Sequence, residues 1–160
     1  AEDGIRDIHC SLVGSEMCIR DSTGDVVREG DDGSLYFVDR RKNVIRRSGE
    51  NIAAVEVEAV LLRHPDVDGC AVCAVPDEIR GDEVFAFVIN NKDVDAKNIF
   101  DHCMAHLTYF KVPGYIAFVP ELPLTASQKV SRGNIKEMAR ANLASGDCAD
   151  LREHKKRTSK

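Results

Sequence analysis

Two apolar runs separated by a short polar connection constrain the fold of this chain more than any other feature. The runs are GCAVCAVP (69–76) and EVFAFVIN (83–90), which are rich in β-branched and aromatic residues, and each predicts a buried β-strand. Segments with helical spacing, AAVEVEAVLLRHP (53–65) and DAKNIFDHCMAHL (95–107), flank them. Because strands and helices alternate, we predict an α/β (α+β) fold in which a small mixed β-sheet is packed with helices.

The helical segments carry recognisable signals of a start and a buried face. In the first segment, Val57, Val60 and Leu61 lie at helical spacing. In the second, Asp95 is suited to cap the N-terminus. The other predicted features are burial of Ile99, Phe100, Cys103, Met104 and Leu107 in the second helix, and a third helix that follows Ser131, runs to about Leu143 and carries Ile135, Met138 and Ala139 on one face.

Further extended segments surround this central part. DVVREGDDGSLYFVDR (25–40) predicts two short strands joined by a turn at residues 31–33. KNVIRRSGENI (42–52) predicts another extended piece, interrupted at Gly49, and YIAFV (115–119) predicts a short strand.

The ends of the chain differ in character from this middle. Residues 1–22 show neither helical nor strand periodicity, and HCSLVGSEMCIRDS within them resembles translated sequencing-adapter sequence. We expect them to be a non-native leader or a disordered arm, and residues 144–160 to be a polar, frayed tail. The predicted domain is therefore residues 23–143.

Composition narrows the possible functions. The net charge of −5 argues against a dedicated nucleic-acid binder, and no apolar stretch predicts a transmembrane segment. Nothing near the start has the layout of a signal peptide, so we predict a cytoplasmic protein whose six cysteines are thiols rather than a disulfide framework.

A metal site is not predicted, although two groups of residues could suggest one. Cys70 and Cys73 form a CxxC pair, but three positions apart on a strand their side chains point to opposite faces. His102, Cys103 and His106 have no second pair at zinc spacing. Buried cysteines that behave as small hydrophobic residues explain the pattern better.

Three polar clusters lie at joints between the predicted elements. The first is Thr23-Gly24-Asp25, which taken alone is ordinary turn chemistry. The second is VDRRKNVIRRSGENI (38–52), where five cations within eight residues suggest an anion site and Gly49 would allow close approach of a thin ligand; the alternative is a solvated charged face. The third is the loop LPLTASQKVSRGNIK (122–136), which carries the solitary cation Lys129.

Together these clusters resemble motifs of the C-terminal domain of the adenylate-forming superfamily, which comprises acyl-CoA synthetases, luciferases and adenylation domains of peptide synthetases. The TGD cluster resembles the motif that grips the adenosine ribose. DGSLYFVDRRKNVIRRSGENIAAVEVE (32–58) resembles the hinge and the CoA-facing loop, and YFKVPGYIAFVPELPLTASQKVSRGNIK (109–136) resembles the closing motif with its catalytic lysine. The nearest branch is the acyl-CoA ligases of the carnitine and crotonobetaine type.

The resemblance implies a mobile lid domain that swings between two half-reactions, acyl-adenylate formation and thioester formation. It implies ATP, Mg²⁺ and CoA as cofactors, a small carboxylic acid as substrate, and a larger N-terminal adenylation domain as partner, so we expect little turnover by this chain alone. The implied roles are catalysis by Lys129, nucleotide binding by Asp25 and Arg40, a hinge at Asp39, and a CoA-facing surface formed by Arg46, Arg47 and Gly49.

One position departs from the family pattern. The family usually has glycine before the catalytic lysine, where this chain has Gln128. If the loop needs a positive φ there, glutamine costs about 1–2 kcal/mol.

Two alternatives remain open in the sequence. The same lid could serve an adenylation domain that loads a carrier protein, or it could be a non-catalytic interaction module, which Gln128 would favour. Glu56 and Glu58 are interpreted as solvent-facing acids rather than a catalytic pair. The acid that is activated cannot be inferred, since the acyl pocket would lie in the N-terminal domain.

Overall fold

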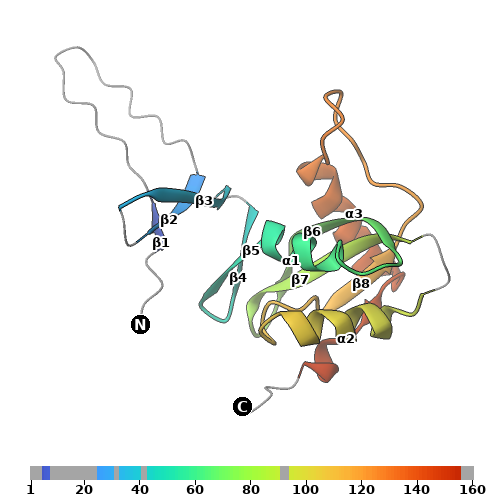
Figure 1. Cartoon of the computed structure of the whole chain (residues 1–160). Helices are drawn as coiled ribbons and strands as arrows, with labels where there is room; N and C mark the ends of the chain where they lie inside the picture. The colour runs from blue at the N-terminus through green and yellow to red at the C-terminus, as the bar shows by residue number, and fades with distance from the viewer. Residues whose placement is uncertain (1–4, 8–24, 31–32, 41–42, 91–93, 156–160) are drawn as a thin grey trace. The chain divides into compact units, whose positions relative to one another are not determined.

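The computed structural model describes residues 5–7, 25–30, 33–40, 43–90 and 94–155 (Figure 1). The chain divides into two compact units, Ala1–Val44 and Ile45–Lys160. In the part of the chain that the structure describes, no helix is long and apolar enough to cross a membrane.

The first unit contains a three-stranded antiparallel sheet in the order β1-β2-β3. The two strands predicted within residues 25–40 are confirmed, and their turn is closed by a hydrogen bond from the Gly30 amide to the Ser34 carbonyl at 2.8 Å. Residues 5–7 form β1, which the sequence did not predict because a three-residue strand is too short to display alternation. The strands are β1 (Ile5–Asp7), β2 (Asp25–Glu29) and β3 (Leu35–Arg40).

The second unit contains a mixed sheet in the order β5-β4-β7-β8-β9, with β6 also paired to β7. β6 and β7 form a long antiparallel hairpin, whereas β8 runs parallel to β7. The predicted α/β (α+β) fold with a mixed sheet is confirmed. The strands are β4 (Val44–Arg47), β5 (Glu50–Ala53), β6 (Val67–Asp77), β7 (Gly81–Asn90), β8 (Tyr115–Phe118) and β9 (Ala149–Asp150). The helices are α1 (Ala54–Leu61), α2 (Ala96–His106), α3 (Arg132–Ser145) and the 3₁₀ turn η2 (Arg152–His154).

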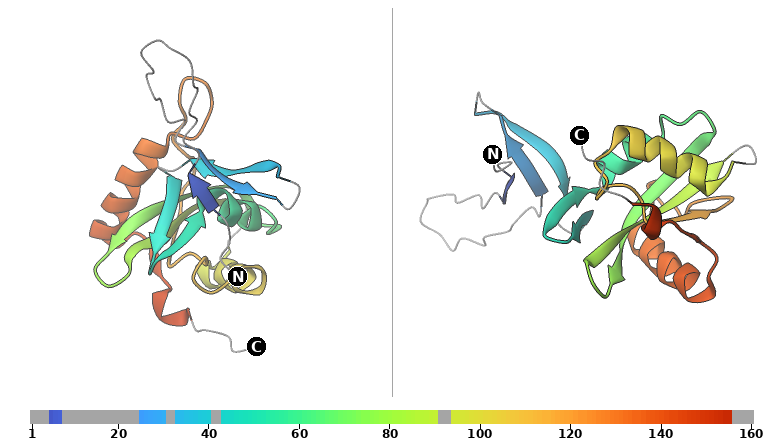
Figure 2. Two further views of the ribbon diagram at one scale, coloured as in Figure 1. Left: turned by 90° about the vertical axis from the view of Figure 1, so that its left-hand side faces the viewer. Right: turned by 90° about the horizontal axis from the view of Figure 1, so that it is seen from below.

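The central strand β7 is buried on both faces because helices cover the sheet from both sides. Val84, Ala86 and Val88 pack into the core beneath α1 and α2, while Phe85 and Phe87 pack into a second core beneath α3. Figure 2 shows α2 and α3 on opposite sides of the sheet. This burial explains why the strand is a continuous apolar run instead of an alternating one.

The helices follow the sequence signals with one exception. Val57, Val60 and Leu61 are buried as predicted, and Asp95 caps α2 by accepting a hydrogen bond from the Lys97 amide at 3.4 Å. The exception is the start of α3, where the residue before the helix makes no side-chain capping bond. Of the other residues predicted to be buried on these helices, Ile99, Phe100, Cys103, Ile135 and Ala139 are buried, whereas Met104, Leu107 and Met138 are partly buried. Ser131 precedes α3 as predicted but makes no cap bond.

Residues 144–155 are part of the fold. β9 pairs with β8, Leu151 is buried, and the Lys155 ammonium donates to the buried carboxylate of Glu83. The prediction of a frayed tail is therefore wrong for this segment, and residues 156–160 lie outside the described part.

The CxxC pair separates across the sheet, as predicted. Cys73 packs in the core beneath α3, whereas Cys70 packs against the core beneath α1 and α2. Burial raises the pKa of both thiols to about 12. These groups are therefore neutral packing side chains at physiological pH.

Candidate functional site

The loop that carries Lys129 is a narrow hairpin between β8 and α3. Leu124 and Val130 form an isolated antiparallel bridge at its base, and the Ser131 amide donates to the Pro123 carbonyl at 2.8 Å. These bonds fix both flanks, so the exposed Lys129 extends from a closed base and not from a loose coil.

The polar residues of this hairpin hold its backbone. The Gln128 amide donates to the Thr125 carbonyl at 2.9 Å, which closes a tight turn, and the Thr125 amide donates to the Lys129 carbonyl at 2.7 Å. The Thr125 hydroxyl accepts a hydrogen bond from the Lys129 amide at 3.2 Å and lies 3.0 Å from the Ser127 hydroxyl. The Ser/Thr content therefore shapes the turn that presents the lysine.

Gln128 adopts the left-handed conformation, with φ of 57°. The positive φ that the family's usual glycine suggests is thus present here without glycine. A side chain in this region costs about 1–2 kcal/mol.

Replacement of Gln128 by glycine is expected to stabilise the chain by about 0.5–1 kcal/mol, since relief of strain outweighs the added freedom of the unfolded chain. Urea unfolding followed by circular dichroism measures the change. Ala126→Gly is the matched control in the same turn, because Ala126 does not have a positive φ, and it should destabilise slightly. Equal shifts of the same sign in both variants would contradict the strain at Gln128.

A second hairpin joins β4 to β5 and carries the expected CoA-facing residues. Its two central residues, Ser48 and Gly49, have φ of 51° and 87°, as a type I′ turn requires. A Cβ at Gly49 would meet nothing within 4 Å, so the backbone conformation favours glycine and the space beside it is open. Arg46 is exposed at the same turn, and its amide donates to the Asp82 carboxylate at 3.1 Å.

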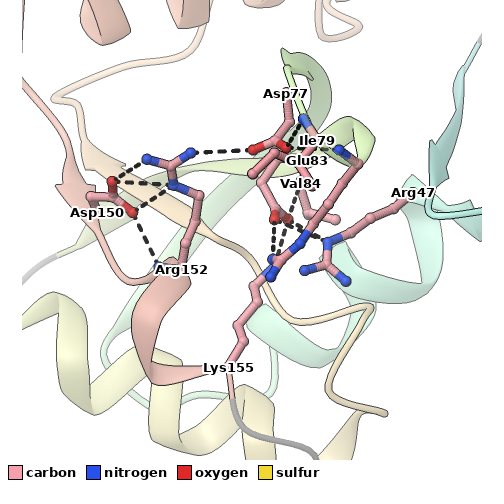
Figure 3. Close-up of polar contacts among 9 residues, drawn as sticks. Arg47, Asp77, Ile79, Glu83, Val84, Asp150, Arg152 and Lys155 are labelled. Carbon is pink, nitrogen blue, oxygen red and sulfur yellow. Dashed lines mark hydrogen bonds and ion pairs between the residues drawn. The ribbon is translucent and has the colours of Figure 1, made fainter.

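Arg47 does not share this exposure. Its side chain is only 4% exposed, and Nε lies 3.0 Å from both carboxylate oxygens of Glu83 (Figure 3). The expectation of a CoA-facing guanidinium is therefore corrected for Arg47, because this group is already paired inside the fold.

Glu83 is a fully buried carboxylate surrounded by cations. Besides Arg47, it accepts hydrogen bonds from the Lys155 ammonium and from the Val84 amide, and Arg80 lies 3.5 Å away. Burial lowers the pKa of Lys155 to about 8, against the opposing effect of the Glu83 charge. Figure 3 shows Arg47 and Lys155 converging on Glu83 from different segments.

Gly114 lies so close to Glu83 that a side chain at this position would displace the carboxylate. A Cβ at Gly114 would lie 2.7 Å from the Glu83 carboxyl carbon. Sequence reasoning missed this cluster, although an acid at the start of the apolar run EVFAFVIN was a signal that it needed a buried partner.

A neighbouring ion-pair group fastens the C-terminal segment. The Arg152 guanidinium contacts the carboxylates of Asp150 at 2.8 Å and Asp77 at 3.2 Å (Figure 3). It also lies over the Tyr115 ring. Its hydrogen bonds to Asp150 lower the pKa of that carboxyl group.

Asp25, Asp39 and Arg40 lie in the first unit. In the β2–β3 ladder, Asp25 is opposite Arg40, and Asp39 is opposite Val26. The described structure covers their backbone only, and their roles stay predictions.

Three polar side chains of α1 and α2, those of Glu56, Glu58 and His102, contact neighbouring elements. The His102 ring lies 3.2 Å from the Val60 carbonyl near the end of α1, and burial lowers the pKa of His102. Among the described residues, no group of three or more His, Cys, Asp or Glu side chains could hold a metal ion. Glu56 is exposed and paired with Lys111, but Glu58 is mostly covered, which corrects its interpretation as a solvent-facing acid.

The sequence of this chain matches a known domain family. Residues 56–129 match the AMP-binding enzyme C-terminal domain. Crotonobetaine/carnitine–CoA ligase of Escherichia coli is 37% identical over 116 residues, which are 71% of this chain and 22% of the ligase.

Solved structures agree. O-succinylbenzoate CoA synthetase of Bacillus subtilis, in complex with its acyl-adenylate intermediate, is 36% identical with a TM-score of 0.68, over 72% of this chain and 24% of that one. ATP-bound MatB of Rhodopseudomonas palustris is 26% identical with a TM-score of 0.68, over 74% and 24%.

The fold and the lysine-bearing hairpin thus define the C-terminal domain of an adenylate-forming enzyme. Residues 56–129 of the chain match the AMP-binding enzyme C-terminal domain family, and the relatives of the chain include acyl-CoA ligases. The chain spans only 22% of the length of the curated ligases that it matches.

Proposed function

We propose that this chain is the lid of an ATP-dependent acid–CoA ligase, which joins a carboxylic acid to AMP and then transfers the acyl group to CoA. The observation that carries this proposal is the exposed Lys129 on a hairpin with a closed base, in a chain whose relatives are CoA ligases. The partner would be a larger N-terminal adenylation domain that holds the acid.

Lys129 fits the first half-reaction chemically. The attack of a carboxylate on the α-phosphorus of ATP, with departure of pyrophosphate, crowds negative charge into a small volume. A compact ammonium on a flexible stem can contact the attacking carboxylate and the phosphate oxygens together, which lowers their repulsion as the bond forms. A planar guanidinium would fit this mixed set of oxygens less well.

The remaining roles in nucleotide and metal binding would be divided between this domain and the N-terminal domain. Asp25 would bind the ribose hydroxyls and Arg40 the phosphate or ribose, while Asp39 would be the hinge about which the lid turns. Mg²⁺ would be held with ATP in the N-terminal domain, since the described residues offer no metal-binding group.

The thiols of this chain are free where the structure describes them, which favours the cytoplasm as the compartment.

After rotation of the lid, the β4–β5 hairpin would face CoA. Arg46 is exposed there, and the open space at Gly49 would admit the thin pantetheine arm. The exposed guanidinium of Arg46 favours CoA, with its phosphates, over a carrier protein as the acyl acceptor.

Gly49→Val in the full-length ligase tests this assignment. Thioester formation from supplied acyl-adenylate should fall at least about tenfold, because strain and bulk would shift the CoA-facing backbone, while pyrophosphate release in the adenylation step should change little. Gly146→Val is the matched control, since Gly146 also has a positive φ and open space around its Cβ position. Equal losses in both half-reactions, or with both variants, would contradict a CoA-facing role.

A further inference from the structure

Arg132 joins the Lys129 hairpin to the body of the second unit. It is the first residue of α3, three positions after Lys129. One guanidinium nitrogen donates to the Glu58 carboxylate at 2.6 Å and to the Val72 carbonyl at 2.9 Å, and the other donates to the second Glu58 oxygen at 3.0 Å. This two-pronged pairing fixes direction as well as distance.

Glu58 is itself held by strand β6. Its carboxylate accepts a hydrogen bond from the Val72 amide at 2.8 Å, and its side chain is 15% exposed against 30% for Arg132. One carboxylate thus ties α1, β6 and the start of α3 together. Ser131 provides no side-chain cap, and Arg132 supplies polar side-chain contacts at this end of α3.

The closed base of the hairpin would couple Lys129 to a movement of this anchor. The Leu124–Val130 bridge and the bond from the Ser131 amide to the Pro123 carbonyl hold the two flanks together, directly before Arg132. A shift of Arg132 would therefore displace Lys129.

We propose that Glu58 and Arg132 form a positioning clamp that sets where Lys129 lies in the adenylation step. The inference rests on the proposed function, and neither residue touches the reacting atoms. The clamp matters because a displacement of about 1 Å at a catalytic group can cost about 10²-fold in rate.

Glu58→Gln in the full-length ligase tests the clamp. Adenylate formation is expected to fall about 10- to 100-fold, while thioester formation from supplied acyl-adenylate stays within about twofold, since Lys129 serves only the first step. Arg132→Lys keeps the positive charge without the two-pronged geometry, and its rate of adenylate formation should fall less than that of Glu58→Gln. Glu56→Gln is the matched control: it removes an ion pair to Lys111 from the same helix, and it should leave both steps unchanged.

A double variant separates positioning from general stability. In a Lys129→Ala background, Glu58→Gln should slow adenylation no further, because the clamp acts only through that lysine. Additive losses, or equal behaviour of the Glu58 and Glu56 variants, would overturn the clamp. If instead Lys129→Ala alone has no effect on adenylation, the proposed function fails and not merely the clamp.

Amide hydrogen exchange in this chain gives a second readout that needs no activity. Glu58→Gln should speed exchange at the Gln128 and Lys129 amides and leave the β7 amides protected. The clamp is overturned if Glu58→Gln leaves hairpin exchange the same as Glu56→Gln does.

Discussion

Replacement of Lys129 by alanine is expected to slow acyl-adenylate formation by the full-length ligase about 10²–10³-fold. The ammonium is exposed on a closed hairpin, so its removal takes away a charge without opening a core. The loss should therefore appear in the rate and not in the stability. Pyrophosphate release measures it, and thioester formation from supplied acyl-adenylate should be affected much less.

Two controls sharpen this result. Lys97→Ala removes another exposed lysine, on α2, and should leave adenylation unchanged. Lys129→Arg keeps the charge in a planar form and should recover only part of the activity. Full activity of the Lys129→Ala enzyme, or equal losses in the two half-reactions, would rule out the assigned role.

Replacement of Glu83 by glutamine is expected to destabilise the chain by about 3–5 kcal/mol. The variant keeps the shape of the side chain beside Gly114 but leaves Arg47 and Lys155 buried without an anion. Urea unfolding at pH 7, followed by circular dichroism, measures the change.

An exposed pair provides the comparison for Glu83. Glu56→Gln makes the same chemical change in the pair with Lys111 and should cost no more than about 1 kcal/mol. Removal of Lys155 as well, in Glu83→Gln/Lys155→Met, should restore part of the lost stability, since one buried cation is gone. Similar unfolding midpoints for the two glutamine variants would mean that the buried carboxylate is not a structural centre.

The sequence predicts most of the second unit because its elements carry local signals. The run EVFAFVIN requires cover on both faces, and the structure supplies it with helices on both sides of β7. Val57, Val60 and Leu61 share a helical face, and Asp95 stands before α2, so these helices follow from spacing and capping alone.

Contacts between distant segments were not predictable in the same way. Arg46 and Arg47 are adjacent arginines in the sequence, yet one is exposed and the other is buried, because only the pleat of β4 and the position of Glu83 distinguish them. Glu58 could not be distinguished from Glu56 by sequence for the same reason. The contact that covers Glu58 comes from Arg132, which lies 74 residues further along the chain.

The Lys129 hairpin was predictable in part. The sequence motif identified Lys129 as the candidate catalytic residue, and the structure adds that Gln128 adopts the positive φ that the family's glycine suggested. The roles of Asp25, Asp39 and Arg40 stay predictions, since they depend on a nucleotide and a second domain.

The contact between Lys155 and Glu83 also determines where the domain can be truncated for recombinant expression. The family match ends at Lys129, whereas the last described side chain in the interior belongs to Lys155. An expression fragment trimmed to the family match, or even to the end of α3, would expose Glu83 and strip β8 of its neighbour β9. Boundaries for recombinant work are therefore better drawn after residue 155, with any affinity tag added beyond it.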